Sequence, residues 1–209
     1  MNSATWMQEW QAMIDSVGTD FGVQYNQHGA DAVEVGAIRR FLEPLEFDCA
    51  LHRDPQAALE HGYRGIIAPY SSLMTWITPA LWEPGRQVWD AAGSDAQPNA
   101  AMRFPWIGDH IPQPPTTRSF ATDLQVEYVE PIVVGDRLSI SGAKLLACKP
   151  KETSVGRGAF LMWQSEVRNQ NGSLVARVCF ERYCYNPVAR SAQESAATPE
   201  AGRGTHGGN

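Results

Sequence analysis

Hydrophobic and polar positions follow two different periods along this chain of 209 residues. In the first part, apolar residues recur at steps of three and four, the spacing of one face of a helix. This spacing predicts helices over 6–14, 38–42, 55–60 and 69–81, together with a short strand over 33–35. From residue 119 the period changes to two, which is typical of strands with one buried face. The strands predicted there cover 119–129, 137–149, 154–169 and 173–185.

Local signals support several of these boundaries. Asp54-Pro55 is typical of a helix start, with an N-cap residue followed by proline at the first helical position. Pro69 and the serines after it open the helix over 69–81, which is apolar nearly all round and is therefore expected to be buried. Asn171-Gly172 between the last two strands predicts a hairpin.

Two segments without regular periodicity help to define the domain boundaries. Residues 83–117 contain many prolines and little periodicity, which predicts a long ordered excursion or lid, with its tryptophans either lining a pocket or capping the sheet. Beyond Pro187 the chain has almost nothing to bury, and we expect disorder there. The predicted organisation is an N-terminal helical extension over 1–30, one domain over 31–187 that includes the excursion, and a disordered tail over 188–209.

Composition narrows the class of protein. Hydrophobic residues make up 43% and charged residues 19%, as in a globular domain. The net charge of −6 argues against a nucleic-acid partner, since an acidic protein gains nothing from counterion release. The chain has no apolar run of about 18 residues that would span a membrane, and Glu9 and Asp15 stand where a signal peptide would be apolar. We therefore expect a cytoplasmic protein.

The cysteines of the chain form no CxxC pair, so reduced thiols are expected rather than a zinc site or a disulfide.

The fold class follows from the order of these elements. One buried helix comes early and an antiparallel series of long strands comes after it, which predicts an α+β fold with a sheet wrapped around the helix. Such a sheet has an edge strand that needs a partner, and a dimer would supply one.

Four segments together resemble a known family, the MaoC-like dehydratases. These hot-dog-fold proteins include (R)-specific enoyl-CoA hydratases and fatty-acid-synthase-type dehydratases, and the likeness is greatest to their N-terminal-type branch. The resemblance covers about residues 31–187 and rests on the segments 34–41, 51–54, 62–69 and 126–136. It implies a long central helix wrapped by an antiparallel sheet, a substrate carried as a thioester of coenzyme A or acyl carrier protein, and no metal or redox cofactor.

The hydration motif of this family has the form G-D-x-N-P-(L/I)-H-x-D. Aligned on Asp54, it places Glu46 at the glycine, Phe47 at the catalytic aspartate and His52 at the histidine. Cys49 and Ala50 replace the motif's Asn-Pro. Asp48 lies one residue after the acid position, and a small adjustment of the loop would bring it into place.

The resemblance implies specific roles for these residues. Hydration of a 2-enoyl thioester requires a group that takes a proton from water, a group that returns one to Cα, and donors for the charge on the thioester oxygen. His52 is expected to transfer the proton, with Asp48 as the neighbouring carboxylate. The backbone N–H groups of Tyr70 and Ser71, in the first turn of the central helix, are expected to bind the thioester oxygen.

Three functions therefore remain open. The first is a 2-enoyl-CoA hydratase or 3-hydroxyacyl-thioester dehydratase, a hydro-lyase acting through His52 and Asp48. The second is a non-catalytic hot-dog subunit that shapes the acyl pocket of a heteromeric dehydratase, which Phe47 at the acid position favours. The third is an acyl-CoA thioesterase. The expected partners are an acyl thioester and a second hot-dog subunit, either identical or different.

Overall fold

The structure is a computed structural model that describes residues 5–22, 26–80, 82, 84–85, 87–89 and 111–188. Most of the predicted excursion over 83–117, including Trp106, lies outside the described residues, as does the predicted tail from residue 189 onwards. Trp82 and Trp89 are described and are exposed. Within the described part, no helix combines the length and the apolar character that crossing a membrane requires.

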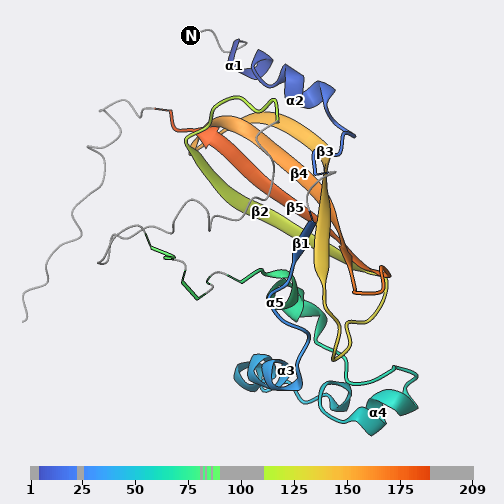
Figure 1. The fold of residues 1–209 in the computed structure, drawn as a ribbon. Coiled ribbons are helices and arrows are strands. Elements are labelled where there is room, and N and C mark those ends of the chain that lie inside the picture. Colours follow the sequence, from blue (N-terminus) through green and yellow to red (C-terminus); the bar gives the residue numbers. More distant parts are fainter. Residues whose placement is uncertain are drawn as a thin grey trace, which may run out of the picture.

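A single antiparallel sheet forms the framework of the molecule (Figure 1). Its five strands lie in the order β1-β3-β4-β5-β2. Their bounds are β1 Asn26–His28, β2 Arg118–Tyr128, β3 Ser139–Thr153, β4 Gly156–Arg168 and β5 Leu174–Asn186. The α+β hot-dog class is confirmed, and so are the four long strands. Strand β1 was missed, because three polar residues carry no alternation, and it lies inside the segment predicted as an N-terminal extension.

Strand β3 is longer than predicted. We expected a turn at 149–151, but the strand continues through Pro150 to Thr153 and turns into β4 there. Among the described strands only β1 pairs with the outer edge of β3, over residues 139–141. Pro150 therefore lies where the outer edge of the sheet is unpaired, a position that tolerates a residue without an N–H group.

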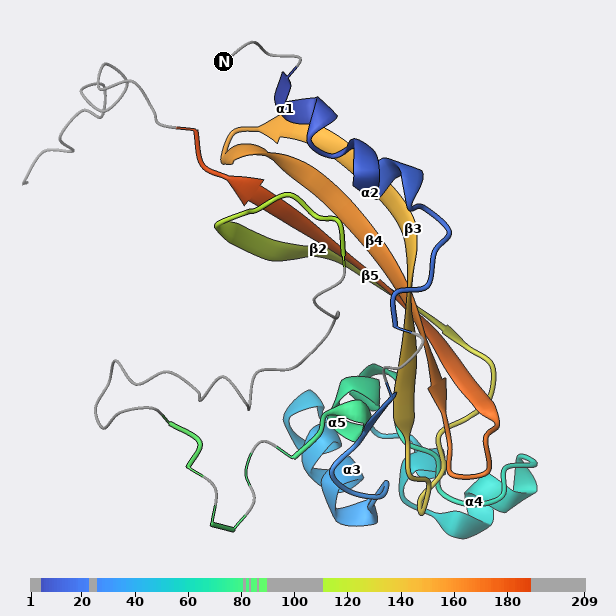
Figure 2. The same ribbon diagram turned by 45° about the horizontal axis from the view of Figure 1, so that its top comes forward.

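The helices are short and lie in two groups (Figures 1 and 2). Helices α1 and α2 lie at one end of the sheet, and α3, α4 and α5 lie at the other. The α-helical bounds are α1 Thr5–Gln8, α2 Gln11–Asp15, α3 Val35–Leu42, α4 Pro55–Glu60 and α5 Leu73–Ile77. Three 3₁₀ turns are η1 Glu43–Leu45, η2 Ala50–His52 and η3 Tyr70–Ser72. The predicted strand over 33–35 is not formed, because α3 begins at Val35.

The central helix is shorter than predicted. Together η3 and α5 run from Tyr70 to Ile77 and stop before the expected end at residue 81. Thr78 is extended because Pro79 follows it, and a residue before proline is disfavoured in the helical conformation. The helix is also buried on one face only, by Leu73, Trp76 and Ile77, whereas Met74 on its other side is exposed.

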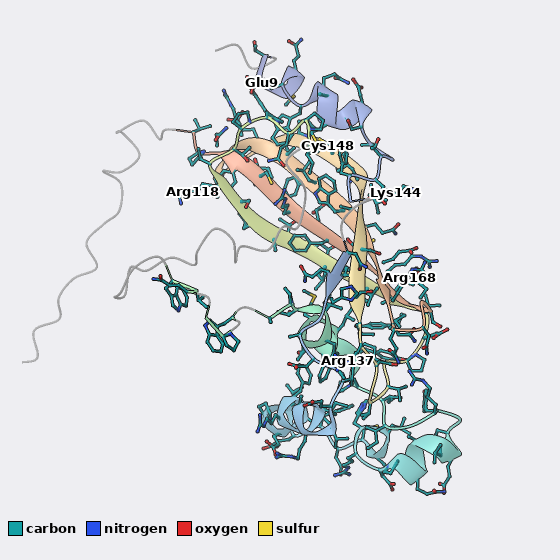
Figure 3. The ribbon with its side chains drawn as sticks, in the orientation of Figure 1. Glu9, Arg118, Arg137, Lys144, Cys148 and Arg168 are labelled. Carbon is teal, nitrogen blue, oxygen red and sulfur yellow. The ribbon has the colours of Figure 1, made fainter. Side chains whose placement is uncertain are left out.

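Each group of helices buries its own half of the sheet. Helices α3 and α5 pack on a core that includes Ile140 of β3, Val167 of β4 and Val178 of β5. The N-terminal helices pack on a second cluster, in which Trp10 and Met13 meet Leu145, Leu161 and Trp163. Cys148 of β3 packs against this second cluster at the same end of the sheet (Figure 3), where burial raises the pKa of its thiol to about 11. The thiol therefore stays protonated at neutral pH.

A buried aspartate organises the loop between β2 and β3. Asp136 is fully buried, and its carboxylate accepts hydrogen bonds from the backbone N–H of Val133, at 2.8 Å, and from the guanidinium of Arg64. The same loop bonds to two other segments, because Val134 N–H donates to Ile66 and Val33 N–H donates to Asp136 at their backbone carbonyls. Asp136 thus holds together the segments that lead into α3 and into η3.

We expect Asp136→Ala to lower the free energy of unfolding by about 2–4 kcal/mol, because it leaves the N–H of Val133 without an acceptor and Arg64 without its counter-ion. Denaturant unfolding followed by circular dichroism measures this change. Glu127→Ala is the matched control, since Glu127 pairs with Arg177 on the surface and its side chain is 68% exposed. That control should cost less than about 1 kcal/mol, and equal losses in the two variants would contradict a structural role for Asp136.

Candidate active site

His52 is held in a buried position by a rigid stretch of chain. It ends the 3₁₀ turn η2, and only 9% of its surface is exposed. Helix α4 begins three residues later, at Pro55, and the Asp54 carboxylate before it accepts from the N–H of Gln56 at 2.8 Å, so the predicted N-cap is confirmed. Because η2 and α4 follow each other with only two residues between them, the backbone at His52 has little freedom to move.

A backbone carbonyl determines which ring nitrogen of His52 carries hydrogen. The Nδ1 atom lies 2.8 Å from the carbonyl oxygen of Ile67. Since a carbonyl oxygen only accepts hydrogen bonds, Nδ1 must be the donor, and in the neutral ring Nε2 then carries the free lone pair. Nε2 is therefore the atom of this residue that can take a proton from another group. This bond could not be predicted from the sequence, because it joins a side chain to a main-chain carbonyl 15 positions away.

The loop before His52 supports the alignment of the hydration motif. Glu46, at the position of the motif's glycine, has a φ of 49° and a ψ of 34°, in the left-handed region that glycine adopts most readily. Phe47 therefore occupies the position of the motif's aspartate. Its ring lies next to that of His52, with 5.7 Å between the ring centroids. An aromatic ring thus stands beside the imidazole where the family motif has a carboxylate.

The Asp48 carboxylate is not paired with His52, as its expected role would require. Its side chain is 76% exposed and forms an ion pair with Arg53. Asp48 and His52 do line the same open cavity of about 560 Å³, together with residues of α3 and η1. The structure therefore brings the two residues to one cavity but pairs the carboxylate with Arg53 instead of the imidazole.

Tyr70 and Ser71 lie at the start of the central helix, as predicted. Their N–H groups belong to the first turn, η3, where amides have no acceptor within the helix. Tyr128 of β2 fixes this turn, because its hydroxyl donates to the carbonyl of Tyr70 and the two rings lie 4.4 Å apart. Burial, and secondarily the neighbouring Tyr70, raise the pKa of Tyr128 to about 12, so the donor is protonated at neutral pH. No local pattern in the sequence predicts this contact between helix and sheet, because residues 70 and 128 are far apart in the chain.

Ser72 has a structural role, as expected from its position. Its hydroxyl donates to the carbonyl of Pro69 at 2.6 Å and accepts from the indole of Trp76 at 2.9 Å. Both bonds are buried and hold the first turn against the core. Among the described residues there is no group of three or more His, Cys, Asp or Glu side chains placed to hold a metal ion.

A second cavity, of about 590 Å³, lies on the sheet beside α5 and does not include His52. It is lined mainly by apolar side chains, among them Met74 and Ile77 of α5 and Trp163 of β4. The helix whose first turn carries the Tyr70 and Ser71 amides therefore forms part of this cavity's wall.

An antiparallel sheet packed against a short helix is the α+β architecture expected of a hot-dog protein. The sequence profile of the FAS1-like dehydratase domain region matches residues 19–178. The chain belongs to this family and is a MaoC-like hot-dog protein, which confirms the resemblance stated from its motifs.

The chain is also similar to several known proteins. A protein of Thermomonospora curvata described as a probable enoyl-CoA hydratase alpha subunit is 25% identical over 150 residues, which cover 72% of this chain and 44% of that protein. The chain thus spans less than half the length of this curated relative. The ChsH1-ChsH2 complex of Mycobacterium tuberculosis contains a chain of the same fold, with a TM-score of 0.57, 17% identity and coverage of 88% of this chain and 95% of that one. A MaoC-like dehydratase from Rhodospirillum rubrum gives a TM-score of 0.48 at 20% identity, over 83% and 94% of the two chains.

We predict that neutral His52 carries its proton on Nδ1 and not on Nε2, because the Ile67 carbonyl accepts from Nδ1. Long-range ¹H–¹⁵N spectra of the ¹⁵N-labelled chain at alkaline pH distinguish the two nitrogens. His52→Gln identifies the signal by its loss. Exposed His61, whose similar bond to Ala57 competes with water, is the internal comparison. A protonated Nε2 on neutral His52 would contradict the assignment.

Proposed function

We propose that this chain is a hydro-lyase subunit that adds water to 2-enoyl thioesters, or removes it from 3-hydroxyacyl thioesters, with His52 as the proton-transfer residue. The observation that carries the proposal is the bond from His52 Nδ1 to Ile67, which leaves Nε2 as a base on a buried ring in an open cavity. The family membership of the chain supplies the class of reaction.

In this mechanism one nitrogen serves both proton transfers. Nε2 takes a proton from water as the water oxygen bonds to Cβ, and the electrons of the double bond move towards the thioester carbonyl. The imidazolium then returns the proton to Cα, and the carbonyl is restored. The Ile67 carbonyl orients the ring throughout, because Nδ1 donates to it in both the neutral and the charged form.

The charge on the thioester oxygen requires donors that are already in place. We assign this role to the N–H groups of Tyr70 and Ser71, which open η3. The bond from the Tyr128 hydroxyl to the Tyr70 carbonyl supports it, because it ties this turn to β2.

Asp48 is proposed as the carboxylate that orients the water. This role requires its side chain to leave Arg53 and turn towards the imidazole. The pair is exposed on both sides, with side chains 76% and 61% exposed, and such surface pairs contribute little free energy, about 0–1 kcal/mol. The rearrangement therefore costs little.

The partner is proposed to be a second hot-dog subunit, identical or homologous. Strand β2 is at the edge of the sheet and pairs along one side with β5. Its apolar residues Phe120 and Leu124 are exposed, and an edge strand of eleven residues whose other side pairs with no described strand favours association. The acyl thioester is the proposed substrate.

The purified chain should hydrate crotonyl-CoA or a longer enoyl-CoA, measured as loss of the enoyl-thioester absorbance. His52→Ala should lower the rate by about 10²–10⁴-fold, the usual contribution of general acid–base catalysis, with folding checked by circular dichroism. Asp48→Asn should lower it less, since the ring keeps its orientation from Ile67. An unchanged rate in His52→Ala would remove His52 from the mechanism, and release of free thiol would indicate a thioesterase.

A second candidate is the non-catalytic subunit of a heteromeric dehydratase. One observation favours it: Phe47 occupies the acid position against His52, while the Asp48 carboxylate is bound by Arg53. In this case the chain alone is inactive, and adding a second MaoC-like subunit restores hydration. The chain would then contribute its cavities and its sheet edge.

Phe47→Asp tests whether the lack of a carboxylate at residue 47 limits the hydration rate. A carboxylate at this position stands next to His52, so hydration should rise at least about tenfold over that of the unchanged chain. Phe47→Asn, which removes the ring without adding charge, is the matched control. Equal rates in the two variants would contradict the idea that a missing carboxylate limits activity.

A further inference from the structure

The cavity on the sheet has a mainly apolar wall with one charged residue in it. It holds about 590 Å³, within the range of sites that bind small molecules. Its wall includes Met74 and Ile77 of α5, Phe180 of β5 and Trp163 of β4. Arg182 of β5 is its only charged lining residue among those described.

Arg182 belongs to the row of side chains that faces the core. It lies opposite Leu161 of β4 and Ala121 of β2, and directly opposite residues of a sheet point to the same face. The same row of β5 continues with Val178 and Phe180, since alternate residues of a strand share a face. A guanidinium therefore stands where the pattern of the strand places apolar groups.

The charge of Arg182 is not neutralised within the described residues. Its one hydrogen bond there runs from Nη2 to the side-chain oxygen of Gln113 at a long 3.4 Å. Its Nε–H is buried without an acceptor, and no described carboxylate lies within ion-pair distance. A cation held on an apolar wall with most of its donors unused is costly unless an anion joins it.

Trp163 presents a second unused donor in the same wall. Its side chain is 4% exposed, and its indole Nε1–H has no acceptor in the described structure. Buried indole N–H groups usually have a partner. A guanidinium with one long hydrogen bond on a mainly apolar wall indicates a ligand that is mainly hydrocarbon but carries oxygen.

We propose that this cavity binds an acyl group whose far end carries a carboxylate, and that Arg182 recognises that carboxylate. A guanidinium binds a carboxylate through two parallel N–H···O bonds, which its two Nη atoms can supply together. The apolar wall encloses the methylene chain. The inference rests on the proposed function for the thioester end, because Met74 lies one turn beyond the Tyr70 and Ser71 amides.

Saturated esters test this binding without any reaction. Titration calorimetry with the full chain compares hexanoyl-CoA with adipoyl-CoA, and decanoyl-CoA with sebacoyl-CoA, so that each pair differs by one terminal carboxylate. In at least one pair the carboxylate ester should bind at least about tenfold more tightly, as expected for a charge-assisted pair. Arg182→Met should abolish the preference, and Arg182→Lys should keep part of it.

Arg177→Met is the matched control, because Arg177 lies on the same strand but pairs with Glu127 on the surface. It should leave the preference unchanged. His52→Gln should also leave it unchanged, so a failure of the catalytic proposal is distinguishable from a failure of this one. Equal binding within both pairs, binding of no ester, or a preference that persists in correctly folded Arg182→Met would overturn the inference.

Discussion

The extended segment from Ile66 to Ala68 is the backbone connection on which the candidate site depends. Its amides and carbonyls bond on both sides at once. Ile67 N–H donates to Leu51 and the Ile67 carbonyl accepts from His52, while Ala68 N–H donates to Ile132 and the Ile66 carbonyl accepts from Val134. The loop of His52 and the loop of Asp136 are thus held by one segment, which leads directly into η3. The position of the imidazole is consequently linked to the position of the helix start.

This arrangement orients the imidazole of the expected acid–base pair but places no carboxylate against it. The imidazole is buried, oriented and fixed in one tautomer by groups that do not take part in the chemistry. The Asp48 carboxylate is paired with Arg53 on the surface, and a phenyl ring lies beside the imidazole. An enzyme built this way needs a rearrangement of Asp48 or a carboxylate from a partner, whereas a non-catalytic subunit needs neither. The two candidate functions therefore differ in one physical property, the charge next to Nε2.

The sequence predicted those parts of the fold that depend on local rules. Alternation located the four long strands, and Asp54-Pro55 located the start of α4, because each signal acts over a few residues. The helix over 69–81 was predicted too long, although Thr78-Pro79 carries the local signal that ends it. Strand β1 could not be found, since its polar residues pair with β3 only through long-range backbone bonds. The motif placed His52 in the site, but its bond to Ile67 and the pairing of Asp48 with Arg53 depend on tertiary geometry. Arg182 did leave a signal, a charge in the apolar row of β5.

The central helix connects the proposed donors for the thioester oxygen to the sheet cavity. Its first turn carries the Tyr70 and Ser71 amides and is tied to β2 by the Tyr128 hydroxyl, while Met74 and Ile77 line the sheet cavity. Because the helix ends at Ile77, its two ends are only about 10 Å apart at 1.5 Å per residue. A ligand held at its far end by Arg182 would therefore have its thioester end restrained near the first turn. Binding free energy gained far from the reacting atoms would then serve to orient them, which is how remote contacts raise a reaction rate rather than affinity alone.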